Sequence, residues 1–210
     1  MFNMGFHRLP IGAVPQGMGA GGHPGSRPVA VLATLAAVAF GLRAVIELPG
    51  EVTYWDPQTP RDYAAVALTS LALLFLGGTL WAMGRTGQRM DTRTRKAARV
   101  SRVSLRTAAA AALVVSFSNF LEDFLRLRWF GTTFVAGILV LSLALLTATV
   151  ARFAATPRKA PAEALLLLAI TAGVVFLSLS MFLACLALLA VAAYYARSRI
   201  TTVRPPSDAS

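Results

Sequence analysis

Five long apolar runs constrain the fold of this chain more than any other feature of its sequence. They cover residues 29–48, 63–83, 107–121, 132–150 and 162–196. Each approaches or exceeds the roughly 20 residues that an α-helix needs to cross about 30 Å of hydrocarbon. Only 14% of the 210 residues are charged, whereas an ordinary soluble domain has about 25%. The runs therefore predict an all-α fold, a polytopic integral membrane bundle with the lipid bilayer as its solvent.

The distribution of basic residues predicts how the bundle is oriented. The loop 85–106 between the second and third runs is strongly basic, and Asp91 is its single acid. The positive-inside rule places such a loop in the cytoplasm. By alternation, the acidic loop 47–62 faces outward and both termini are cytoplasmic. We therefore expect a multi-pass protein of the cell membrane.

The same basic loop contributes the largest part of the formal net charge of +11. Because the charge is concentrated next to predicted spans, we expect it to contact anionic lipid headgroups and not nucleic acid. The residues expected to make these contacts are Arg85, Arg89, Arg93, Arg95, Lys96, Arg99 and Arg102.

The last apolar run is ambiguous, because residues 162–196 would form a helix of about 50 Å at 1.5 Å per residue, much longer than a bilayer is thick. It is either one long span or a hairpin that turns near residues 178–180. A hairpin returns Tyr194, Tyr195 and Arg197 to the cytoplasmic interface, where such residues are favoured. We therefore favour six spans, with five as the alternative.

The six-span interpretation divides the chain into three parts. Residues 1–27 are rich in Gly and Pro and are expected to form a disordered cytoplasmic tail, as are residues 200–210. Between them, residues 28–199 form the transmembrane domain. Its expected spans are about 29–48, 61–83, 106–125, 131–151, 162–178 and 181–197. Thr59, Pro60 and Asp62 match the start signature of a helix, with a capping hydroxyl, a proline at the first position and a carboxylate at the third.

The residues that usually carry membrane chemistry are missing from the predicted spans. Both histidines, His7 and His23, lie in the N-terminal tail, and both lysines, Lys96 and Lys159, lie in predicted inner loops. The spans thus offer no histidine for a haem or a metal and no lysine for a Schiff base. The sequence also lacks GxSxG, HExxH and phosphate-loop motifs. We expect no enzymatic activity, no cofactor and no metal site.

One polar stretch interrupts the third run, in the sequence SFSNFLEDFLRLRWF from residue 116 to residue 130. On a regular helix Ser116, Asn119, Asp123 and Arg126 share one face, and Glu122 lies beside it. The face would sit in the outer part of the bilayer. The first run ends on the same side with an Arg and a Glu four residues apart. The residues of this candidate polar pocket are Arg43, Glu47, Asn119, Glu122, Asp123 and Arg126.

Three interpretations of this stretch remain open. The carboxylates can simply lie near water at the outer interface, beside aromatic residues such as Trp129. They can line an outward-facing pocket, because ionisable groups in lipid are costly and usually serve a pathway or a binding site. They can also help to dock another protein.

The function is therefore predicted only at the level of class. We expect a non-enzymatic accessory or structural membrane protein that acts through lipid or protein contacts, with a membrane-protein partner or a second copy of this chain. The alternative is a small-solute transporter or channel, with the polar stripe of the third span as its outer vestibule.

Overall fold

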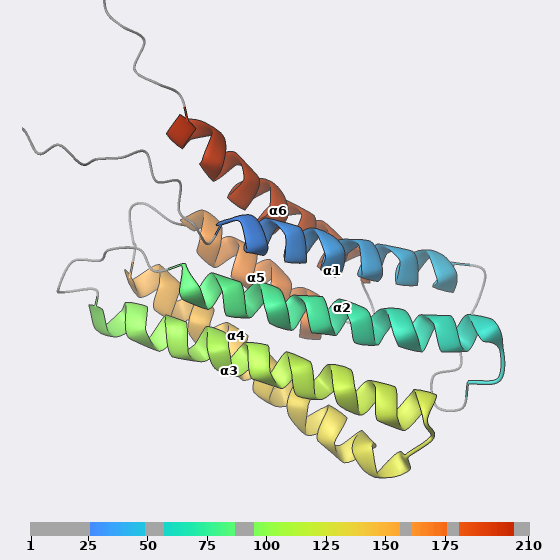
Figure 1. Cartoon of the computed structure of the whole chain (residues 1–210). Coiled ribbons are helices and arrows are strands. Elements are labelled where there is room, and N and C mark those ends of the chain that lie inside the picture. Colours follow the sequence, from blue (N-terminus) through green and yellow to red (C-terminus); the bar gives the residue numbers. More distant parts are fainter. Residues whose placement is uncertain (1–25, 49–56, 87–94, 156–160, 176–180, 204–210) are drawn as a thin grey trace, which may run out of the picture.

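The computed structural model describes residues 26–48, 57–86, 95–155, 161–175 and 181–203 (Figure 1). Six α-helices occupy these ranges: α1 (Ser26–Glu47), α2 (Pro60–Arg85), α3 (Arg95–Asn119), α4 (Gly131–Ala155), α5 (Pro161–Val175) and α6 (Met181–Val203). A π-helix, η2 (Phe120–Phe124), extends α3, and a 3₁₀ turn, η3 (Arg128–Phe130), leads into α4. The described residues contain no β-strand. The predicted all-α bundle is confirmed.

Each helix packs against the next one in the chain, and α6 also packs against α1, so that the six helices form a closed ring. In Figure 1, α1, α2 and α3 lie in front, and α4, α5 and α6 lie behind them. The start of α1 and the end of α6 are at the same end of the bundle. The end of α2 and the start of α3 are at that end too, so we call it the basic end, and we call the opposite end, where α1 ends and α2 begins, the acidic end.

The ambiguous apolar run forms two helices, α5 and α6, which pack against each other. The six-helix interpretation is therefore confirmed, and the single long helix is wrong. The turn expected near residues 178–180 lies outside the described residues. α6 begins at the expected residue but continues to Val203, past the predicted end at 197. The predicted tail 1–27 lies outside the described residues except for its last two positions, which belong to α1.

Four of the helical segments are long and apolar enough to cross a membrane, namely Ser26–Glu47, Pro60–Arg85, Arg95–Phe124 and Arg128–Ala155. The apolar parts of α5 and α6 are shorter, at Ala162–Ala172 and Phe182–Arg197. With 15 residues, α5 is about 22 Å long and falls short of about 30 Å of hydrocarbon.

Local sequence explains where two of the helices begin. Thr59 caps α2, and its backbone N–H donates to Asp62 Oδ2 at 2.9 Å, while Pro60 occupies the first turn. This capping box agrees with the start signature in the sequence. α3 includes the basic segment from Arg95 onward, well before the expected span start at 106, because that segment has no Gly or Pro to interrupt the helix.

The interior of the bundle combines many small residues with leucines such as Leu73 and Leu80, and large apolar residues also cover much of the exterior. Alanines contribute a large share of the buried core, among them Ala33 and Ala37 of α1. A Cβ on Gly77 would lie 3.1 Å from the carbonyl oxygen of Ala109, and one on Gly137 would lie close to Val115. Leu, Val and Phe side chains are instead exposed on every long helix. This inverted distribution is typical of helices that pack closely in lipid.

Candidate functional site

Two polar residues of the third-span stripe face α2. Ser116 Oγ donates to the carbonyl oxygen of Ser70 at 2.6 Å. Asn119 Nδ2 donates to Ser70 Oγ at 2.9 Å and to the carbonyl oxygen of Val66 at 3.3 Å. Ser70, Ser116 and Asn119 are all buried. This part of the stripe is therefore a helix–helix contact that satisfies its polar groups within the bundle.

Arg43 connects α1 to α2 near the acidic end. Its side chain is only 4% exposed, and Nη2 lies 2.9 Å from Glu47 Oε1 on the next turn. Nη1 donates to Thr69 Oγ1 and, at 3.4 Å, to the carbonyl oxygen of Ala65. Arg43, Glu47 and Thr69 are thus bonded to one another, and Asp123 of η2 lies close enough for its charge to act on Arg43. We call these four residues the α1–α3 polar cluster.

Glu122 and Asp123, the two carboxylates of the stripe, lie where the α-helix changes to a π-helix. From Phe120 to Phe124 the helix is a π-helix, and the N–H of Leu125 donates to the carbonyl oxygen of Phe120 at 3.3 Å. Glu122 and Asp123 are partly exposed here. The prediction of a regular α-helix through residue 125 is therefore wrong, because the helix becomes a π-helix at Phe120. The extra residue in the turn breaks the single polar face that a 3.6-residue period implied.

Arg126 lies beyond the helix and has a left-handed backbone, with φ of 59°. Its Nη2 donates to the carbonyl oxygen of Pro57 and to Tyr63 Oη, both at 3.2 Å. The ring of Tyr63 also meets Phe124 edge-on, with 5.5 Å between centroids. Arg126 therefore ties the corner after α3 to the start of α2. Arg126 was predicted to line the polar pocket, but the structure places it outside the α1–α3 polar cluster.

A second buried polar group joins α4, α5 and α6 and was not predicted from the sequence. Arg152 Nη1 lies 3.0 Å from Glu163 Oε2, and their side chains are 8% and 7% exposed. Tyr195 Oη donates to Glu163 Oε1 at 3.2 Å. We call Arg152, Glu163 and Tyr195 the α4–α6 polar cluster.

A signal for this cluster was present in the sequence. Glu163 is the single acid in the run 162–196, and an acid in so apolar a run needs a partner. The sequence alone does not show that this partner is Arg152, which lies on a different helix.

The residues expected to contact anionic lipid lie on the surface at the basic end. Arg85, Arg95, Lys96, Arg99 and Arg102 are exposed, whereas Arg89 and Arg93 lie outside the described residues. The guanidinium carbons of Arg85 and Arg106 lie 5.5 Å and 5.6 Å from the ring centre of Trp81. Both guanidinium groups therefore lie over the ring of Trp81 at distances suited to cation–π interactions.

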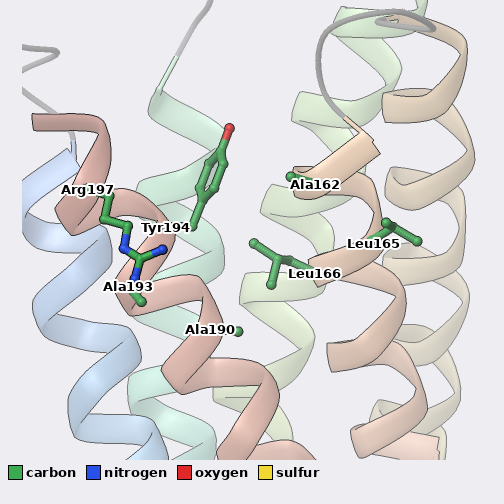
Figure 2. A pocket seen from close by; sticks show the side chains of 7 residues that line it. All are labelled: Ala162, Leu165, Leu166, Ala190, Ala193, Tyr194 and Arg197. Atoms are coloured by element: carbon green, nitrogen blue, oxygen red, sulfur yellow. The ribbon is translucent and has the colours of Figure 1, made fainter. Parts of the chain in front are cut away.

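Two open grooves flank α6. The larger, of 660 Å³, separates α5 from α6 and is drawn in Figure 2. The smaller, of 440 Å³, separates α1 from α6. Ala193 lines both grooves. Both are lined mainly by apolar side chains, so they suit an apolar ligand.

Among the residues that the structure describes, no group of three or more His, Cys, Asp or Glu side chains could hold a metal ion. Cys185 is a free thiol, and its sulfur would lie 3.4 Å from a Cβ on Gly41, so it packs between α6 and α1.

Comparison with known proteins yields no match: no family model, no curated protein and no solved structure resembles this chain significantly.

Proposed function

We propose that this protein is a multi-pass integral membrane protein whose six helices lie in the cell membrane. The observation that carries the proposal is the distribution of side chains: polar groups inside the bundle bond to neighbouring helices, while Leu, Val and Phe cover the outside. In water such an exterior would promote aggregation, whereas in lipid it costs nothing. Trp129, 90% exposed beyond the third span, fits an interfacial aromatic position.

The orientation we propose places the basic end in the cytoplasm. Exposed Arg and Lys side chains gather there, at the end of α2 and the start of α3. They would contact anionic lipid headgroups of the inner leaflet. The start of α1 and the end of α6 share this end (Figure 1), which supports two cytoplasmic termini.

Within the membrane we propose a non-enzymatic accessory or structural role that acts through lipid or protein contacts. Support comes from the α1–α3 polar cluster, where Arg43 bonds to Glu47 and Thr69, and from the bond between Asn119 and Ser70. Hydrogen bonds of this kind stabilise helix pairs in lipid. These hydrogen bonds use the polar side chains that would otherwise be available to line a solute pathway.

A small-solute transporter or channel is the second candidate, and one specific observation favours it. The partly exposed Glu122 and Asp123 lie on a π-helix, and such turns frequently occur at functional sites. An outward-facing vestibule would use these carboxylates.

A flux experiment separates the two candidates. Purified protein is reconstituted in vesicles, and solute uptake is compared for the natural chain and for Glu122→Gln with Asp123→Asn. On the accessory role, the natural chain adds no flux over empty vesicles. A flux that the two changes abolish in a protein that stays folded would establish transport and reject the accessory role.

Orientation is tested by cysteine labelling of intact cells, in a Cys185→Ala background. We expect a membrane-impermeant thiol reagent to label Asp123→Cys from outside. Val140→Cys, an exposed position within α4, is the control that lipid should protect. Labelling of residue 123 only after the membranes are opened would reverse the proposed orientation.

A further inference from the structure

We infer that the groove between α5 and α6 binds one acyl chain of an anionic glycerophospholipid, whose phosphate pairs with Arg197. This inference rests on the proposed location in the membrane. The groove opens on the side of the bundle that would face lipid, and it runs toward the basic end.

The size and lining of the groove fit an acyl chain. Its volume of 660 Å³ falls within the range of about 300–1,000 Å³ for small-molecule sites. Figure 2 shows Ala162 and Leu166 of α5 facing Ala190 and Tyr194 of α6 across the gap. The groove is open because Ala162 and Ala190 have small side chains, and a larger side chain at either position would fill it.

The groove is held open by its neighbours. On one side α6 packs against α1, and Gly41 of α1 allows close contact with α6 at Cys185. On the other side, Tyr195 bonds to Glu163 at the start of α5. These two attachments fix the separation of α5 and α6 next to Tyr194. The cavity is thus preformed, which lowers the entropic cost of binding.

The positive charge of Arg197 at the end of the groove favours an anionic headgroup. Arg197 is exposed and is the charged residue among those that line the groove. Figure 2 shows its side chain folded back along α6 beside Ala193, with the Tyr194 hydroxyl pointing toward the basic end. The nearest carboxylate of α5, Glu163, is paired with Arg152. A basic groove between helices at the cytoplasmic side is suited to a phosphate headgroup.

The second groove gives the other acyl chain a place. It lies between α1 and α6, measures 440 Å³ and shares Ala193 with the first groove. A lipid with its phosphate at Arg197 could therefore place one chain on each side of α6. From Arg197 to Ala190 the first groove extends about 10 Å along the helix, toward the middle of the membrane.

The test is native mass spectrometry of the purified full-length protein with dioleoyl phosphatidylglycerol or dioleoyl phosphatidylcholine at equal concentrations. We expect the anionic lipid to bind about five-fold more tightly, the factor for one basic residue beside one net negative charge, because the choline of phosphatidylcholine offsets the charge of its phosphate. Arg197→Gln should abolish this preference. Ala190→Phe should weaken the binding of both lipids, because the ring occupies the groove.

Matched controls are Arg128→Gln, exposed in η3, and Ala110→Phe, exposed on α3, which should leave binding unchanged. Equal losses for Arg197→Gln and Arg128→Gln would mean a diffuse electrostatic contact, and unchanged binding for Ala190→Phe would show that the groove is not the site. Either result overturns the inference. A dimer of the natural chain that Ala190→Phe abolishes would also overturn it, because a second copy would then occupy the groove.

Alkaline carbonate extraction of membranes separates this failure from failure of the proposed function. If the natural chain is released with peripheral proteins, the membrane location itself is wrong. If it stays in the membrane but shows no lipid preference, only the lipid site is wrong.

Discussion

Removing the carboxylate of Glu163 should destabilise the bundle more than almost any other single polar change. In Glu163→Gln, Arg152 keeps its charge but loses the oxygen that lies 3.0 Å from its Nη1. Both side chains are more than nine-tenths buried, so water cannot replace the lost partner. The guanidinium is then left buried beside a neutral amide.

The expected magnitude follows from that burial. Breaking a buried ion pair by removing one partner costs about 3–5 kcal/mol. The lower part of the range applies here, because Arg152 lies in the last turn of α4 and a long side chain near a helix end can reach toward the interface. We therefore expect about 3 kcal/mol for Glu163→Gln and a similar loss for Arg152→Met. The double variant Arg152→Met with Glu163→Leu should recover most of it.

The assay is unfolding of the purified protein by sodium dodecyl sulfate in mixed micelles, followed by circular dichroism. The natural chain, the two single variants Arg152→Met and Glu163→Leu, and their double variant form a double-mutant cycle, and Glu163→Gln is measured beside them. Tyr195→Phe is the matched control: it removes the 3.2 Å hydrogen bond to Glu163 but leaves the ion pair, and it should cost about 1 kcal/mol.

The refuting result is additivity. If the two single changes sum to the double change within about 0.5 kcal/mol, Arg152 and Glu163 do not stabilise each other. The assignment of this pair as the contact that joins α4 to α5 would then be wrong.

Three further predictions concern helix contacts, each measured by the same unfolding assay. Asn119→Leu should cost about 1 kcal/mol, because it removes the 2.9 Å bond to Ser70 Oγ; no loss would show that this bond contributes nothing. Gly137→Ala should cost about 1–3 kcal/mol by crowding Val115, and Val115→Ala in the same chain should restore part of it; equal stability with and without that second change would contradict the crowding. Thr59→Ala should cost about 1 kcal/mol through loss of the cap of α2, whereas Thr59→Ser should cost little.

Features that depend on nearby residues were predictable. The start of α2 follows from the hydroxyl of Thr59 and the carboxylate of Asp62, which lie within one turn of each other. The division of residues 162–196 into two helices followed from the mismatch between helix length and bilayer thickness. The small residues Ala33 and Ala37 of α1, four positions apart, are both buried, as small residues at this spacing are where helices pack closely.

The polar stripe was predictable only in part. Asn119 and Ser116 do share a face, but the π-turn at Phe120–Phe124 interrupts that face before Arg126. A regular period of 3.6 residues contains no information about an inserted residue in a turn. The left-handed Arg126 depends on contacts with Pro57 and Tyr63 of another segment, which the local sequence does not reveal.

The sequence by itself determined the helical class, the apolar character of the helices and the end of the bundle at which basic residues gather, because these depend on composition and on periodicity along the chain. The tertiary structure decided which polar groups meet: Arg43 with Thr69, and Arg152 with Glu163. It also left the grooves beside α6 open. Pairing across helices depends on the rotation and distance of each helix relative to its neighbours, and in an Ala-rich interior many rotations satisfy the same apolar pattern.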